Sequence, residues 1–330
     1  MVKRPRRISM EFYPRNAPTV QLGSSSRRRR GTIAIVIVTG GLLVAAAAAF
    51  GAPRLVGVMA ERNQAVRVRE AALASWESGD LPGTISICEA GLEKEPLDPV
   101  LLSLAGFSAF YRGVAQSDEE ARIEDMDAAI FYLRKVLLVE DTPYRSRALY
   151  VLGKAYYRKG SAWYGEAVEA LLAAVAAGFS AEDAWEHVAL AYDGLGMGER
   201  AIEYFDRALA ERRTDTLLLA AARARAGTGR HAEAEALAME ALSISGDAFV
   251  RELCRFFLGE LLEARGATPE AESQYRTILE ENPESAEAHY RLGVLAQNAG
   301  DPALARAEWR KAVSIDPVHA GARQKLAERP

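Results

Sequence analysis

The stretch from Tyr290 to Trp309 has the hydrophobic and polar spacing of two amphipathic helices, yet small residues occupy positions where such helices usually carry bulk: Gly293, Ala296, Gly300 and Ala305. Two antiparallel helices joined by a short turn can approach closely only where the side chains at the crossing are small. We therefore expect Gly293 and Ala305 to face each other or the next helix pair. Gly300 falls where the first helix must end, and glycine accepts the left-handed backbone that a helix C-terminus often needs.

The same pattern recurs along the chain with a period of 34 residues. This shift aligns Gly293 with Gly259, Gly300 with Gly266, Ala305 with Ala271, Trp309 with Tyr275 and Pro317 with Pro283. Repeats of this length made of two helices resemble the tetratricopeptide repeat, whose pattern is W-x2-LG-x2-Y, then A-x3-F, then P. The residues that carry the resemblance best are Trp185, Val188, Ala189, Tyr192, Ala201 and Phe205, and Gly106 and Gly153 mark the same position in earlier units. The resemblance implies an all-α fold, a right-handed α-solenoid of about seven helix-turn-helix units.

The repeat domain is predicted to span residues 65–319. Its units run over 65–98, 99–145, 146–181, 182–215, 216–251, 252–285 and 286–319, and a C-terminal capping helix follows at 320–330. The second unit is stretched by an acidic insert near Ser117 to Asp125. The fifth unit lacks the large apolar residues of the pattern and carries Ala222, Arg225 and Ala238, so spacing alone supports it.

An uncharged run, Thr32 to Phe50, precedes the repeats and is long enough to cross most of a hydrocarbon core about 30 Å thick. We interpret residues 31–52 as a transmembrane helix, residues 1–30 as a disordered basic cytoplasmic tail and residues 53–64 as a linker. Arginines at Arg27 to Arg30 place the N-terminus in the cytoplasm by the positive-inside rule. The expected location is then a bacterial inner membrane, single-pass, with a periplasmic repeat domain.

Other interpretations of this N-terminal region stay open. The alanines at Ala45 to Ala49 offer cleavage sites for a signal peptide, and the Arg-rich leader is also compatible with a mitochondrial presequence. A line of small residues, Gly41, Ala45 and Ala49, would let two such helices pack into a homodimer. The basic tail could itself bind anionic lipid or nucleic acid.

Charge and candidate chemistry narrow the function of the repeats. Nine of the 41 Lys and Arg residues lie in residues 1–30 with a single acid, so the remainder carries 32 bases and 44 acids, a formal charge of −12. An acidic body argues against nucleic acid as its ligand. The four histidines lack metal-ligand spacing, and Cys88 and Cys254 lie too far apart to pair. Gly194 to Arg200 joins two helices and lacks the ending of a phosphate loop. We predict no catalytic site, metal or cofactor.

The resemblance also implies where a partner protein would bind. In the family, fixed positions of the first helix of each unit line a concave groove that holds extended peptides or helices. Carried onto this sequence, these positions hold Phe107, Phe110 and Tyr111 in unit two, Arg147, Tyr150, Lys154, Tyr157 and Arg158 in unit three, and Asp183, Glu186 and Asp193 in unit four. Such a surface suits a peptide with an apolar stretch beside an acidic one. The alternative is that several of these aromatic residues pack between units and the charges are solvated.

Together these features favour a non-catalytic, membrane-anchored scaffold or assembly factor for a multi-protein envelope complex. A substrate-recruiting or regulatory arm of an enzyme is the alternative function, and a secreted repeat protein released by signal cleavage is the alternative form.

Overall fold

The computed structural model describes residues 52–140 and 142–328. Within these residues the chain forms fifteen α-helices, one short 3-10 helix and no strand, so the all-α prediction is confirmed for the described part of the chain. Contacts divide the chain into Met1–Asn63 and Gln64–Pro330, and the fold described below is that of the second unit.

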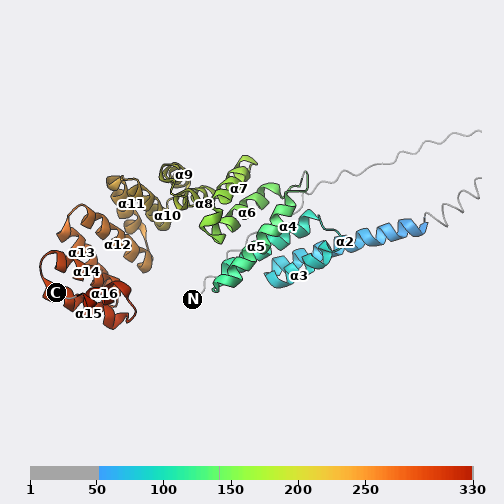
Figure 1. The fold of residues 1–330 in the computed structure, drawn as a ribbon. Helices are drawn as coiled ribbons and strands as arrows, with labels where there is room; N and C mark the ends of the chain where they lie inside the picture. Colours follow the sequence, from blue (N-terminus) through green and yellow to red (C-terminus); the bar gives the residue numbers. More distant parts are fainter. Residues whose placement is uncertain (1–51, 141, 329–330) are drawn as a thin grey trace, which may run out of the picture. The chain divides into compact units, whose positions relative to one another are not determined.

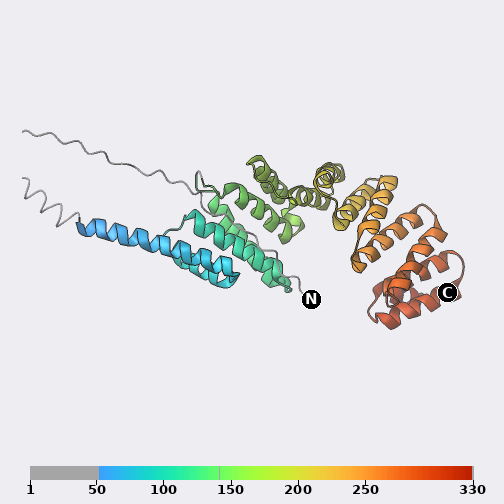
Figure 2. The same cartoon turned by 180° about the vertical axis from the view of Figure 1, so that it is seen from behind.

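The helices of this unit form successive antiparallel pairs (Figure 1, and from behind in Figure 2). The first helices of the pairs are α2 (Ala52–Ser78), α4 (Pro99–Ala115), α6 (Arg145–Lys159), α8 (Ala184–Gly194), α10 (Asp215–Gly227), α12 (Ala248–Ala264) and α14 (Ala286–Asn298). The second helices are α3 (Leu81–Leu92), α5 (Glu119–Val136), α7 (Tyr164–Ala176), α9 (Gly198–Glu211), α11 (His231–Ile244), α13 (Thr268–Glu281) and α15 (Pro302–Ile315). We call these the A and B helices. The 3-10 helix η2 (Ser161–Trp163) lies between α6 and α7, and α16 (Ala320–Ala327) packs on α15.

The B helices α5, α7, α9, α11 and α13 each contact the A helix of their own pair and the A helix that follows, and α3 contacts α4. This is the connectivity of a helical solenoid. Each unit expected from the sequence contains one A and one B helix. The first unit, 65–98, contains only the C-terminal part of α2 as its A helix. The stretched second unit is accommodated by an α5 of 18 residues. The unit boundaries themselves stay predictions.

A recurring pair of residues determines how closely the A and B helices cross. In the last pair, a Cβ added at Gly293 would lie 2.4 Å from Nε1 of Trp309 and 3.0 Å from the carbonyl oxygen of Ala305. At Gly259 the same added atom would lie 2.5 Å from the ring of Tyr275. The glycine therefore makes room for a large buried side chain of the B helix, which fills the interior of the pair.

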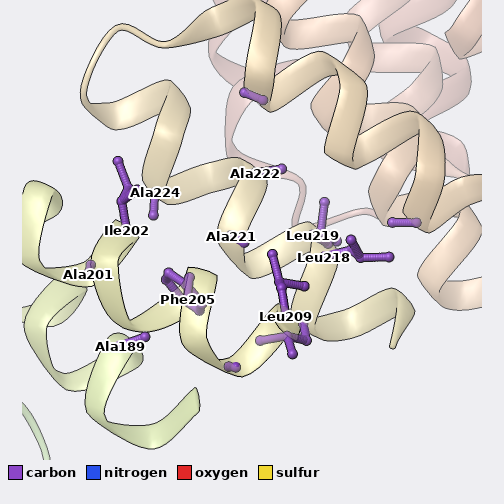
Figure 3. Close-up of a cluster of buried hydrophobic side chains, with 14 of the residues drawn as sticks. Ala189, Ala201, Ile202, Phe205, Leu209, Leu218, Leu219, Ala221, Ala222 and Ala224 are labelled. Atoms are coloured by element: carbon purple, nitrogen blue, oxygen red, sulfur yellow. The ribbon is translucent and has the colours of Figure 1, made fainter. Parts of the chain in front are cut away.

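The fifth pair solves the same packing problem without an aromatic residue. Ala222 of α10 and Ala238 of α11 are both fully buried at the corresponding positions. They belong to a cluster of buried residues that also includes Phe205 of the preceding pair (Figure 3). Arg225 occupies a position where the repeat pattern has an apolar residue. It is only 6% exposed and forms ion pairs with Asp206 and Glu233.

The turns between A and B helices use glycine where the backbone is left-handed. Gly300 has φ +83°, as predicted for the residue that ends α14, and Gly266 has φ +75° at the matching position. Several helices begin at an aspartate whose side chain accepts backbone hydrogen bonds, for example Asp98 from Val100 and Leu101 at the start of α4 and Asp301 from Leu304 at the start of α15. Local capping thus sets the helix ends that the sequence pattern indicates.

The predicted single-pass location in the inner membrane is contradicted. No helix among the described residues is both long and apolar enough to cross a membrane. The two longest, α2 and α5, have charged residues along their length, such as Arg69 in α2 and Asp127 in α5. The run Thr32 to Phe50, on which the transmembrane, periplasmic and dimer predictions rested, lies outside the described residues.

Candidate protein-binding surface

The predicted groove residues of the third pair share one face of α6. Arg147, Tyr150, Lys154, Tyr157 and Arg158 recur three, four, three and one positions apart, so they form a stripe along the helix. All five are half-buried or exposed. α6 lies between the A helices α4 and α8 and contacts both. The stripe is therefore a surface to which the two neighbouring A helices add side chains.

Two of the predicted groove residues on α4 are not available to a partner. Phe107 and Phe110 are 1% and 3% exposed, so they belong to the core and not to the groove. Phe107 packs against Trp76, with ring centroids 6.3 Å apart. Removing these aromatic rings from water stabilises the solenoid more when they are buried between its helices than when they stay at its surface. Tyr111 remains, half-buried and 5.8 Å from the Trp76 ring.

An ion pair joins α6 to the start of α8. Nζ of Lys154 lies 2.7 Å from Oδ2 of Asp183 and 3.1 Å from Oη of Tyr150, and the Tyr150 hydroxyl donates to the other oxygen of Asp183. The Tyr150 ring also packs on Phe179, with centroids 4.8 Å apart. Burial would raise the pKa of Asp183, but Lys154 and the Tyr150 hydrogen bond hold it below its usual value. The opposite charges that the sequence predicts for two units of the groove thus neutralise each other.

His187 completes this cluster and was missed by the sequence analysis, which considered histidines only as metal ligands. Its Nδ1 lies 2.9 Å from the backbone oxygen of Asp183, so Nδ1 carries the hydrogen and Nε2 is left as an acceptor. Burial, with the nearby Lys154 and Arg158, lowers the pKa of His187 to about 4. The imidazole is therefore neutral at physiological pH. The edge of its ring faces Tyr157, with centroids 5.9 Å apart.

The remaining charged groove residues fall into two groups. Glu186 is paired with Arg212, which belongs to the end of the same helix pair. Arg147 and Arg158 form neither an ion pair nor a hydrogen bond within the described part of the chain, although Arg147 lies over the Phe107 ring at 6.0 Å. Asp193 is exposed, and partial burial raises its pKa. The unpaired charges of this surface are thus two arginines and one aspartate.

A hollow of about 440 Å³ opens elsewhere, between the B helices α9 and α11. Its apolar lining includes Leu209 and Leu237, and the small Ala236 leaves it open. Its charged groups are already paired: Arg225 with Asp206 and Glu233, and Arg213 with Glu240. The hollow offers less unpaired charge for recognition than the stripe on α6.

Metal and thiol chemistry find little support among residues 52–140 and 142–328. No three His, Cys, Asp or Glu side chains there are grouped so that they could hold a metal ion. Burial raises the pKa of Cys88 to about 12 and that of Cys254 to about 11, so neither thiol is a ready nucleophile.

Two stretches of the chain, residues 182–215 and 286–317, match family models described as tetratricopeptide repeat. These two segments are therefore similar to tetratricopeptide repeats. They cover the helix pairs α8–α9 and α14–α15. Tetratricopeptide repeats imply a scaffold for protein–protein interaction, and proteins built from them are generally non-catalytic.

Solved structures of tetratricopeptide repeat proteins share the fold. The C-terminal part of a TPR repeat-containing protein from Cytophaga hutchinsonii matches with a TM-score of 0.61 and 15% identity, over 79% of this chain and 100% of that chain. A tetratricopeptide repeat protein from Parabacteroides merdae matches with a TM-score of 0.52 and 17% identity, over 80% and 98%. At these identities the likeness establishes the all-helical tetratricopeptide-like solenoid alone. No curated protein matches the sequence.

Proposed function

We propose that this protein is a non-catalytic scaffold that holds a segment of a partner protein against the A helices α4, α6 and α8. The observation that carries the proposal is the stripe on α6, where aromatic rings and unpaired cations lie together on an accessible face. Rings such as that of Tyr157 supply contact area at little cost in conformational entropy, and exposed charges set orientation and register.

The polar cluster behind the stripe supports the same function. Asp183 holds Lys154, Tyr150 and His187 in fixed positions between the third and fourth pairs. A surface ordered in advance loses less entropy when a partner binds. The cluster therefore favours a defined binding face on this part of the solenoid.

Affinity purification with matched variants tests this function. Arg147→Glu with Arg158→Glu reverses two charges on the stripe, and Arg200→Glu with Arg310→Glu reverses two exposed and unpaired arginines on B helices. We expect the first variant to lose specific partners that the second and the native protein recover, as identified by mass spectrometry. Equal recovery by both variants, with unchanged folding, would exclude the stripe as the binding face.

A further inference from the structure

The three cations on the α6 stripe differ in what already neutralises them. Lys154 is 17% exposed and is paired with Asp183, so its charge is used inside the protein. Arg147 and Arg158 are left without a carboxylate partner among the described residues. Many other arginines of the solenoid do have one: Arg69, Arg112, Arg213, Arg225 and Arg230 each meet an Asp or Glu. Unpaired arginines also lie elsewhere, such as Arg200 and Arg310 on B helices, so this face is distinguished by two free guanidinium groups on one helix stripe together with tyrosine rings.

Their spacing is set by the helix. Arg147 and Arg158 are eleven residues apart, which is about three turns, about 16 Å along the axis and about 20° around it. They stand at the two ends of one stripe, with Tyr150 and Tyr157 between them. Arg147 leans toward α4, where it lies over Phe107 and acts on the pKa of Tyr111. Arg158 lies close enough to α8 for its charge to lower the pKa of His187.

Two polar atoms at the Arg158 end of the stripe are also free. The Tyr157 hydroxyl and Nε2 of His187 form no hydrogen bond within the part of the chain that the structure describes. Because Nδ1 of His187 donates to the Asp183 backbone, Nε2 can accept a hydrogen bond from a backbone N–H. The face thus combines a cation at each end of the stripe with a hydroxyl of Tyr157 and an acceptor nitrogen of His187 near Arg158.

We propose that the partner segment is an extended acidic peptide, with one carboxylate for Arg147 and another for Arg158. This inference rests on the proposed function and specifies its ligand. An extended chain advances about 3.3 Å per residue, so the two carboxylates are about five residues apart. Guanidinium groups bind carboxylates through two parallel hydrogen bonds, which selects Asp or Glu at both positions.

The same charges determine what opposes binding. Asp183 is neutralised by Lys154 and Glu186 by Arg212, so neither repels an acidic segment strongly. Asp193 is exposed and unpaired, and its charge acts on the nearby Tyr157. It stands at the Arg158 end of the stripe and weakens that contact. Removing its charge by Asp193→Asn strengthens binding of an acidic peptide.

The test is an array of 12-residue peptides probed with the full chain. Each peptide carries Glu, Gln or Lys at two positions three to eight residues apart, and its other positions vary over all amino acids. We expect binding to select Glu pairs about five residues apart, with dissociation constants of soluble copies at least about tenfold below those of their Gln counterparts at low salt. This advantage shrinks as ionic strength rises.

Variants assign each end of the peptide. Arg147→Gln removes the preference for one glutamate and Arg158→Gln the preference for the other, whereas Arg147→Lys keeps part of it. Asp193→Asn lowers the dissociation constant of the Glu pair. The control Arg200→Gln, an exposed arginine on α9 without an ion pair, leaves all values unchanged. Circular dichroism melts establish that each variant is folded.

The outcomes separate this inference from the proposed function. If peptides bind without preference for acidic pairs, and binding is lost in Tyr157→Glu, the acidic ligand is wrong and the binding face stands. If no peptide of any composition binds the native protein, both proposals are overturned.

Discussion

The ion pair between Lys154 and Asp183 should be one of the costlier interactions to break on this surface. The side chains are 17% and 27% exposed, and their charged atoms lie 2.7 Å apart. At an effective dielectric constant of about 20 the attraction at this distance is about 6 kcal/mol before desolvation is subtracted. Breaking a fully buried pair costs about 3–5 kcal/mol, because the remaining charge stays buried without a partner. Partial exposure reduces this, so we expect Asp183→Asn to destabilise by about 2–3 kcal/mol.

A double-mutant cycle isolates this interaction from the rest of the cluster. Asp183→Asn keeps the shape of the side chain and an acceptor for the Tyr150 hydroxyl but removes the charge, and Lys154→Met removes the ammonium and keeps its stem. We expect the two changes together to cost less than the sum of the single changes, with a coupling energy of about 1–2 kcal/mol.

Denaturant unfolding followed by far-ultraviolet circular dichroism measures these energies. A repeat protein can unfold in more than one step. The transition of the third and fourth pairs is therefore also followed by the fluorescence of Trp163 and Trp185, with Trp76 and Trp309 replaced by Phe in every protein compared. A coupling energy below about 0.3 kcal/mol would refute the reasoning, because it is within the error of independent sites.

Two further predictions concern pH and packing. The free energy of unfolding should fall as the pH drops from about 6.5 to about 4. Unfolded histidine binds a proton near pH 6.5, whereas burial and the charges of Lys154 and Arg158, opposed by Asp183, lower the pKa of His187 to about 4 in the folded protein. This difference corresponds to about 3 kcal/mol, and the dependence of stability on pH in this range should be weaker in His187→Gln. Gly293→Leu should destabilise by about 1–3 kcal/mol through overpacking against Trp309, measured by thermal unfolding.

Each of these two predictions has an internal control. If His187→Gln and the native protein lose stability in parallel between pH 6.5 and 4, the buried neutral imidazole does not contribute to the pH dependence of stability. For the packing prediction, Gly165→Ala adds a methyl group in α7 where no atom lies within 4 Å, so it should be neutral or stabilising by up to about 1 kcal/mol. A Gly293→Leu protein that melts with the native one would remove the close crossing of α14 and α15 from the account.

The repeat period could be predicted from the sequence because each unit uses the same kinds of residue at its helix ends and helix crossings. Glycine ends a helix at Gly300 through its left-handed backbone, and a small residue such as Gly259 faces a large one such as Tyr275. Even the fifth pair, with alanines in place of large residues, could be located from spacing. These features depend on neighbours within one or two helices, so a single sequence contains them.

The accessible face was harder to predict because it depends on contacts between pairs. Family positions cannot separate Phe107, which the neighbouring helix covers, from Tyr111, which it leaves half-exposed. Nor could the sequence reveal that Lys154 is neutralised by Asp183, 29 residues away. The free charge of Arg158 could be recognised only after these pairings were known. The expected location in the inner membrane rests on residues 32–50, and no helix of the described residues can cross a membrane.

Photo-cross-linking from single positions in cells that express the protein tests the central claim most directly. A photoreactive phenylalanine analogue replaces Tyr111, beside the α6 stripe, or Met239, which is 57% exposed on the B helix α11. We predict a discrete cross-linked partner from position 111, whose attached peptide mass spectrometry identifies, and none from position 239. The same partner cross-linked equally from both positions, or from position 239 alone, would contradict binding at the A-helix face.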